Sequence, residues 1–221
     1  MNNLEGLVFK VQAYQESNRL LQVFTKLGKI SLKVTGAQKM NNNSRVLAQN
    51  LTQISFEYTD LKSFLTLKNG KIINDFKDIK NDYQRTKDAS LTTEIIGRVL
   101  VDDFYNEKVY EMLIEALEHE NIKISSLSFA LKVLYYLGYG MDLKGNGNKI
   151  KGFNIKRGSV VYIDENIELD LNYEETIELL KLTYTKISNL EDIKGNTIDI
   201  IKKFTYNYYL DKLDIRLKTL E

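Results

Sequence analysis

Eight lysine and arginine side chains near the start of the chain could contact the phosphates of a nucleic acid. Phosphate binding needs long cationic side chains but no unique geometry, because the attraction is electrostatic and independent of base sequence. The pattern therefore predicts a basic DNA-binding surface in this part of the chain. Its residues are Lys10, Arg19, Lys29, Lys33, Lys39, Arg45, Lys68 and Lys71.

Aromatic residues in the same region could add base stacking, as in proteins that bind single strands. We expect the phenylalanines to fill a hydrophobic core, because Phe is among the residue types most often buried. Tyr14 and Tyr58 are then the stacking candidates. The aromatic residues considered are Phe9, Tyr14, Phe24, Phe56, Tyr58 and Phe64.

The charge of the chain is distributed unevenly. Residues 1–80 hold 12 Lys and Arg against 6 Asp and Glu, a balance of +6, whereas the whole chain of 221 residues has a net charge of +1. A basic first part and an acidic second part favour two modules, the first suited to a polyanion. The alternative is a chance scatter of surface charge.

The sequence offers little to an enzyme or a metal site. Cysteine is absent and His119 is the one histidine, which excludes disulfides, thiolate ligands and cysteine nucleophiles. Asp102 and Asp103 form an acidic pair, and Glu111, Glu115 and Glu118 share one helix face that is typical of a solvated surface. We predict a protein that is not an enzyme and has no catalytic residues, metal or cofactor.

Five short runs with alternating apolar residues precede residue 78 and predict strands. They cover residues 4–13, 19–25, 29–35, 53–59 and 64–73, with a polar loop over 36–46. Five strands of this length favour an OB-fold, a small barrel that binds oligonucleotides. We therefore expect an OB-fold DNA-binding domain over 1–78.

After residue 78 the apolar period changes to three and four residues, which predicts helices. Ser90 and the pair Ser125-Ser126 are the expected N-caps, and the later helices are expected over 173–188 and 196–210. The predicted class is thus α+β, with an α-helical domain over 79–221. A basic, glycine-rich insert near 140–165 interrupts it, with a short strand expected over 159–163.

The insert contains the run Gly145-Asn146-Gly147-Asn148-Lys149, which lacks the spacing of a phosphate loop. A basic hairpin that touches DNA or a partner and a solvated turn both remain open. No apolar run approaches the roughly 18 residues that span a bilayer. The first residues lack the layout of a signal peptide, so we expect a cytoplasmic protein.

Several segments along nearly the whole chain form a recognisable series. The first ones are Gly6-Leu7-Val8-Phe9-Lys10, Tyr14-x-Glu16-Ser17-x-Arg19-Leu20, Val23-Phe24-Thr25, Gly28-Lys29-Ile30 and Gly36-Ala37-x-Lys39. The later ones are the run from Leu67 to Ile73, Leu131–Leu143, and the closing pair of segments Tyr209-Leu210 and Arg216–Thr219. In this order, the segments resemble the RecO family of bacterial recombination mediators.

The resemblance implies an N-terminal OB-fold followed by a helical domain. It also implies a function: binding single- and double-stranded DNA, annealing it and, with RecR, helping to load RecA onto strands covered by single-stranded-DNA-binding protein. RecA is then an indirect partner, and no membrane is involved. The alternative is an OB-fold protein-interaction module with little DNA affinity of its own.

This sequence departs from the family pattern at three places. Many members carry four zinc-binding cysteines in the region that is Lys144–Asp164 here, so the resemblance implies an insert without zinc that rests on other contacts. Many members have cations where this chain has Thr35 and Gln38, which implies a weaker DNA contact by the following loop. Leu127 and Ser128 stand where some members have basic residues that contact the single-stranded-DNA-binding protein.

Overall fold

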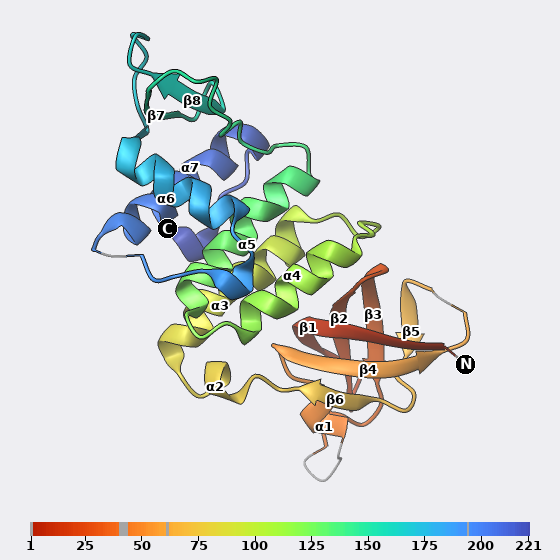
Figure 1. Ribbon diagram of the computed structural model, residues 1–221. Coiled ribbons are helices and arrows are strands. Elements are labelled where there is room, and N and C mark those ends of the chain that lie inside the picture. Colours follow the sequence, from red (N-terminus) through yellow and green to blue (C-terminus); the bar gives the residue numbers. More distant parts are fainter. Residues whose placement is uncertain (1, 40–43, 61, 194) are drawn as a thin grey trace. The chain divides into compact units, whose positions relative to one another are not determined.

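The computed structural model describes residues 2–39, 44–60, 62–193 and 195–221 (Figure 1). The chain divides into two compact units. We call residues 1–86 and 93–114 the barrel unit, and residues 87–92 and 115–221 the helical unit. This is the α+β class that the sequence predicts. The domain boundary near residue 78 stays a prediction.

Six strands form the sheet of the barrel unit, in the order β5-β3-β2-β1-β4-β6. β5 is parallel to β3, and every other neighbouring pair in this sheet is antiparallel. The strands are β1 (Asn2–Tyr14), β2 (Asn18–Thr25), β3 (Gly28–Val34), β4 (Thr52–Tyr58), β5 (Phe64–Thr66) and β6 (Lys71–Asn74). A four-residue helix, α1 (Ser44–Leu47), precedes β4.

The sheet returns on itself because β5 and β6 are two parts of one run. β5 pairs with β3, and the amide of Leu67 continues this pairing by donating to the Lys33 carbonyl at 2.9 Å. The run then crosses to β4, where the amide of Glu57 donates to the Lys68 carbonyl at 3.2 Å. The predicted OB-fold is confirmed. The single strand predicted over 64–73 is wrong, because Asn69 has a left-handed φ of 48° that interrupts it.

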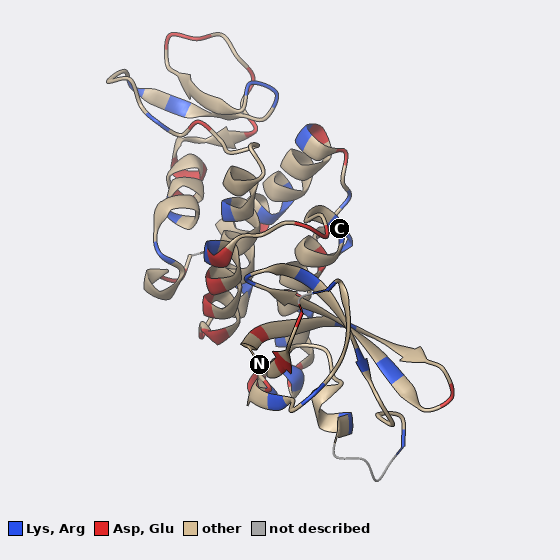
Figure 2. Ribbon diagram, turned by 90° about the vertical axis from the view of Figure 1, so that its right-hand side faces the viewer, with Lys and Arg blue, Asp and Glu red and all other residues tan. Residues whose placement is uncertain are grey.

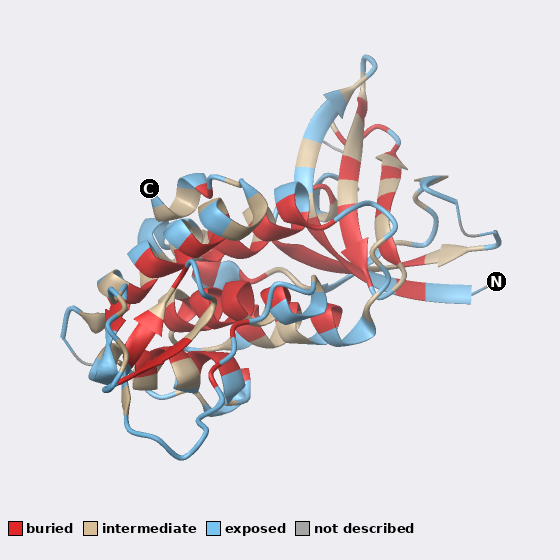
Figure 3. Cartoon of the chain, turned by 90° about the horizontal axis from the view of Figure 1, so that it is seen from above, coloured by how far each residue is buried: buried red, intermediate tan, exposed pale blue. Residues whose placement is uncertain are grey.

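The barrel core follows from the alternation of side chains along each strand. In β3 the buried residues Ile30, Leu32 and Val34 alternate with Lys29, Ser31 and Lys33. Figure 3 shows how buried and exposed residues are distributed along the chain. The core is completed from the other strands, and its residues are Leu4, Val8, Leu21, Val23, Ile30, Leu32, Val34, Ala37, Ala48, Ile54 and Phe56.

Residues beyond the predicted barrel cover one side of it. They belong to the short π-helix η1 (Ile95–Val99), the segment after it and the start of α4 (Glu107–Glu118). Phe24 faces away from the barrel core, yet it is 0% exposed because its ring lies 6.3 Å from that of Tyr110. The hydroxyl of Tyr110 also accepts a hydrogen bond from the Gln53 amide at 3.3 Å.

The helical unit is built around α5 (Ile122–Tyr136), which is buried along most of its length. α6 (Tyr173–Tyr184), α7 (Thr197–Leu213) and the short 3-10 helices η2 (Ile187–Asn189) and η3 (Lys218–Leu220) complete it. Two further helices, α2 (Lys77–Lys80) and α3 (Tyr83–Glu94), precede η1. None of the helices in the described ranges is long and apolar enough to cross a membrane.

Two predicted helix starts are wrong. α3 begins at Tyr83, before Ser90. α5 begins after Asn121, whose side chain accepts a hydrogen bond from the amide of Ile124. Ser125 lies inside the helix, where its hydroxyl donates to the Ala116 carbonyl at 2.7 Å. A serine before an apolar run can therefore bridge two helices instead of capping one.

The insert forms a three-stranded sheet in the order β8-β7-β9. Its strands are β7 (Ile150–Asn154), β8 (Ser159–Tyr162) and β9 (Leu171–Asn172), and β8 confirms the strand predicted there. Carboxylates tie its turns together. Asp170 accepts a hydrogen bond from the amide of Ile155 at 2.7 Å, and Glu165 accepts one from the amide of Tyr162 at 2.8 Å. These contacts hold the insert without cysteine ligands.

Candidate nucleic-acid interface

One outer face of the barrel carries lysines and aromatic rings, and the described residues that form it, named below, include no Asp or Glu. The strand register places Lys10, Gln22, Ser31 and Phe64 in one row across β1, β2, β3 and β5. A second row contains Gln12, Leu20, Lys33 and Thr66. We call these eight residues, with Tyr14 at the end of β1, the open face. Figure 2 shows the distribution of charged residues over the chain.

An aromatic pair lies on the open face. The rings of Tyr14 and Phe64 are 6.3 Å apart and inclined by 54°. Phe64 is 45% exposed, so the expectation that it fills the core is wrong. Phe56 does lie in the core, at 1% exposed. Tyr14 keeps its place as a stacking candidate, and the structure adds Phe64 to it.

A cavity of about 300 Å³ opens beside Phe64. Tyr58, the second predicted stacking residue, lines this cavity, and so does Lys68. The Glu57 carboxylate is held by the Asn69 side chain, which donates a hydrogen bond at 2.7 Å. The full lining is Glu57, Tyr58, Thr59, Phe64, Leu65, Thr66 and Lys68. The open face and this cavity therefore share Phe64 and Thr66.

Lys29 does not join the other predicted phosphate ligands. Its amino group donates to the Leu100 carbonyl at 2.6 Å and lies 3.4 Å from the Asp102 carboxylate. It also lies 5.9 Å from the centre of the Phe9 ring, and its side chain is only 9% exposed. Burial lowers the pKa of Lys29, although Asp102 acts in the opposite direction. We therefore remove Lys29 from the DNA-binding set.

A Lys29→Ala substitution should lower the stability of the barrel unit and leave the electrostatic part of DNA binding unchanged. Loss of a charged hydrogen-bond donor typically costs about 1.5–3 kcal/mol. Urea unfolding checks the first effect, and the dependence of DNA affinity on salt concentration checks the second. A reduced salt dependence at unchanged stability would return Lys29 to the interface.

Three predicted cations lie near the end of the barrel that holds α1. Arg19 is bonded internally, through a hydrogen bond of 2.8 Å to the Ala48 carbonyl. Lys39 and Arg45 are exposed, although the tip of the predicted loop at residues 40–43 lies outside the described residues. The Gln38 side chain donates to the carbonyl groups of Gln15 and Asn18, so this residue fastens the loop to the β1–β2 turn.

The last two predicted cations lie on different parts of the barrel. Lys68 is exposed and adjoins the cavity beside Phe64. Lys71 in β6 pairs with Ser55, which pairs in turn with Glu5. Lys71 therefore shares its row with a carboxylate and lies off the open face. Of the eight predicted residues, Arg19 and Lys29 are bonded inside the unit and Lys33 is partly exposed. The other five, Lys10, Lys39, Arg45, Lys68 and Lys71, are exposed.

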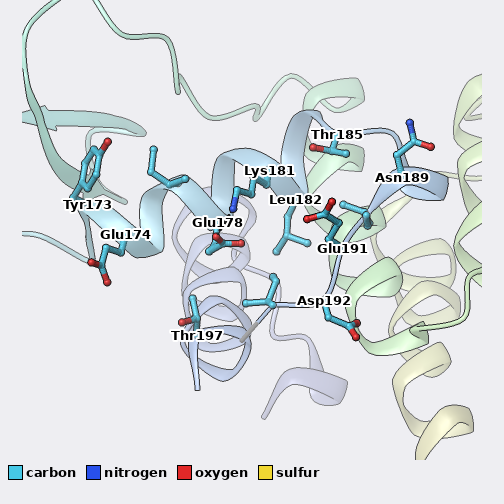
Figure 4. A pocket seen from close by; sticks show the side chains of 13 residues that line it. Tyr173, Glu174, Glu178, Lys181, Leu182, Thr185, Asn189, Glu191, Asp192 and Thr197 are labelled. Carbon is cyan, nitrogen blue, oxygen red and sulfur yellow. Dashed lines mark hydrogen bonds and ion pairs between the residues drawn. The ribbon is translucent and has the colours of Figure 1, made fainter. Parts of the chain in front are cut away.

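The helical unit offers less to a polyanion. A groove of about 860 Å³ lies between α6 and the segment around Asn189–Ile193, and Figure 4 shows its lining. Its charged residues are Glu174, Glu178, Lys181, Glu191 and Asp192, and Lys181 is paired with Glu178. The basic insert has exposed lysines at 144, 149, 151 and 156. Leu127 and Ser128 are 0% exposed and so are not available to a partner.

The described ranges of the chain contain no group of three or more His, Asp or Glu side chains that could hold a metal ion. Asp102 is paired with Lys29, and the Nδ1 atom of His119 accepts a hydrogen bond from the amide of Asn121 at 3.0 Å. Each of these groups has a structural role.

Comparison with known proteins identifies relatives of the chain. A DNA repair protein RecO from Oceanobacillus iheyensis is 23% identical over 95% of this chain and 87% of its own length. A DNA repair protein RecO from Bacillus cereus is 30% identical over 61% of this chain and 56% of its own length. Among solved structures, an asparaginyl-tRNA synthetase from Entamoeba histolytica matches 69% of this chain and 36% of its own length. The TM-score is 0.26 and the sequence identity is 11%. That likeness is too low to carry an argument.

The barrel itself gives the most direct link to a family. Residues 1–76, which hold all six strands of the sheet, match the family model described as the N terminus of recombination protein O. The relatives extend this match into the helical unit. The chain is thus similar to RecO proteins, through the match of residues 1–76 to the N-terminal family model and through a relative that is similar over 95% of the chain.

Proposed function

We propose that this protein acts in DNA repair by binding DNA on the open face of its barrel. The observation that carries the proposal is the open face, on which Lys10 and Lys33 accompany the Tyr14–Phe64 pair and none of the described residues is acidic. Lys10 is exposed and Lys33 is partly exposed, and two such lysines on one face of a sheet can contact the phosphates of one strand, because the attraction needs no base sequence. Both named relatives are DNA repair proteins, which supports the same assignment.

The family relationship supports a more specific role. In this proposal the protein binds single- and double-stranded DNA and anneals complementary strands. With RecR, it helps RecA to load onto strands covered by single-stranded-DNA-binding protein. It makes and breaks no covalent bond, so its residues position DNA and partners and are not catalysts. The proposed DNA-binding residues are Lys10 and Lys33 on the open face, together with four exposed cations elsewhere on the barrel unit, namely Lys39, Arg45, Lys68 and Lys71.

The salt dependence of binding tests the open face directly. We expect the wild-type protein to bind a labelled single strand with an affinity that falls steeply as salt rises. The double variant Lys10→Glu/Lys33→Glu should bind more weakly, and its slope of log affinity against log salt should be smaller by about 0.7 for each lost phosphate contact. The measurement is fluorescence anisotropy over a salt series.

A matched control separates this effect from a change in overall charge. Lys203 is exposed on α7 in the helical unit, so Lys203→Glu makes, away from the barrel, the same charge change that either substitution of the double variant makes alone. Its slope should equal that of the wild-type protein. Equal slopes for the double variant and the wild type would disprove phosphate binding at the open face.

A second candidate function is a protein-interaction module with little DNA affinity. It is favoured by the internal bonds of Arg19 and Lys29, which reduce the number of cations available to DNA. The same titration decides between the two functions when it is repeated with RecR present. An absence of DNA binding in both series would support the interaction module.

A further inference from the structure

We propose that the cavity beside Phe64 takes one unpaired nucleobase, held against the aromatic wall formed by Tyr58 and Phe64. This inference rests on the proposed function and makes it more specific, because it adds a subsite for a base to a surface that binds phosphates. The cavity is lined by residues at the end of β4, in the β4–β5 connection, in β5 and just after it.

The walls of the cavity have the chemistry that a base requires. Tyr58, Phe64 and Leu65 supply apolar surface, and every nucleobase has an aromatic face that can stack on such rings. Tyr14 contacts Phe64 with its ring centre 6.3 Å away, so the Phe64 ring has a neighbour on the open face. This contact restrains an aromatic side chain that is 45% exposed. Restraint before binding reduces the entropy cost of stacking.

The polar lining favours a base over a phosphate. The Glu57 carboxylate would repel a phosphate group inside the cavity, but it can accept a hydrogen bond from the exocyclic amine of a base such as cytosine. Asn69 holds Glu57 in place with a hydrogen bond of 2.7 Å. The other polar side chains of the lining are Tyr58, Thr59, Thr66 and Lys68, of which Lys68 is available to a phosphate next to the base. The cavity volume of about 300 Å³ is at the small end of ligand sites.

Two lysines are placed to hold the phosphates of the same strand. Lys68 adjoins the cavity, and Lys33 pairs in register with Thr66, which is a member of the lining. A base can therefore enter the cavity while neighbouring phosphates remain on the basic surface. A base inside a duplex is stacked and paired, and must leave the helix to enter such a site. The site thus selects single strands or unpaired positions.

The test compares two labelled strands with equal length and equal phosphate number, one of cytidines and one with abasic sites throughout. We expect the wild-type protein to bind the cytidine strand roughly 5- to 140-fold more tightly, the range that corresponds to stacking of one base. Phe64→Ala should remove most of this preference. Its affinity for the abasic strand and its salt slope should not change, because the lysines remain.

Controls keep the outcome interpretable. Phe64→Leu keeps an apolar side chain without the ring and should lose the preference as Phe64→Ala does, while thermal unfolding shows that both variants fold. Tyr83 is 84% exposed on α3, so Tyr83→Ala removes an aromatic ring elsewhere and should keep the full preference.

The possible failures are distinct. If both folded Phe64 variants keep the wild-type preference, the base site is disproved, and salt-dependent binding of the abasic strand still supports the proposed function. If the wild-type protein binds both strands equally, the base site is also disproved and phosphate binding stands. If it binds neither strand, the proposed function and the base site are both overturned.

Discussion

Raising the pH from about 10 to about 12 should lower the free energy of unfolding by several kcal/mol, because buried tyrosines keep their protons in the folded protein. Burial raises the pKa of Tyr110 to about 12 and that of Tyr208 to about 12. The pKa values of Tyr135 and Tyr209 are also raised, mainly by burial. The hydroxyl of Tyr209 is fully enclosed and donates to the Ala130 carbonyl at 2.8 Å.

Stability falls in this pH range because the tyrosines ionise first in the unfolded state. An unfolded tyrosine loses its proton near pH 10, whereas these folded tyrosines still hold theirs, so ionisation stabilises the unfolded state relative to the folded state. Their full contribution to stability is present below pH 10 and is lost as the pH rises through their folded values. Each unit of pKa difference corresponds to about 1.4 kcal/mol.

A buried lysine acts in the opposite direction at lower pH. Burial lowers the pKa of Lys132 to about 8, against 10.5 for an ordinary lysine. Its contribution to stability therefore rises between these two values and is constant above them. Because Lys132 increases the stability as the pH rises towards 10 and the tyrosines decrease it above pH 10, the free energy of unfolding should pass through a maximum near pH 10 and then fall.

Urea unfolding at a series of pH values measures this profile. Tyr110→Phe and Tyr209→Phe should each make the decline above pH 10 shallower, because the substituted residue no longer titrates. Tyr83→Phe is the control, since Tyr83 is 84% exposed and should leave the slope as it is. An identical slope in all four proteins would contradict the assignment of raised pKa values to Tyr110 and Tyr209.

Replacing Gly6 with alanine should destabilise the barrel unit by about 3 kcal/mol or more, because the new methyl group has no space. Its carbon would lie 2.4 Å from Cγ1 of Val23, 2.8 Å from Cγ2 of Thr25 and 2.9 Å from the Phe24 carbonyl oxygen. Gly6 lies in β1, which pairs with both β2 and β4. Relief of the clash must therefore disturb the centre of the sheet.

Gly97→Ala is the matched control for this substitution. Gly97 belongs to η1 in the same unit, and a methyl group there would meet only the Phe9 ring, at 3.7 Å. Thermal unfolding should show a strong decrease of Tm for Gly6→Ala and little change for Gly97→Ala. DNA binding by Gly6→Ala should disappear at temperatures where the barrel unit is unfolded. A wild-type Tm for Gly6→Ala would show that β1 and β2 can separate without cost.

The alternating pattern of apolar residues predicts most of the barrel correctly, because each strand has one face in the core. The pattern does not reveal the break between β5 and β6, since the left-handed Asn69 lies inside an otherwise regular run. It also hides the exposure of Phe64. That residue pairs with Ser31 in the parallel β3–β5 ladder, and no local signal in the sequence specifies such a distant register.

The sequence also does not predict which of the cations are available to DNA. Alternation places Lys29 and Lys33 on the outside of β3, and both qualify as phosphate ligands on that basis. The sequence cannot show that residues 100–102 bind the amino group of Lys29, because that contact joins positions 71 residues apart. Lys33 remains with the open face because its row continues to Thr66 in β5.

The two compact units are interleaved along the chain. The polypeptide leaves the barrel unit after Thr86, returns to it at Thr93 and leaves again after Ile114. A single proteolytic cut that releases an intact barrel unit must therefore fall after Ile114, and the fragment then keeps residues 87–92 of the helical unit. A gene fragment that ends at residue 78 would lack Tyr110 and Leu100, which cover Phe24 and bind Lys29. An expressed barrel must extend to residue 114 and carry a short piece of the other unit with it.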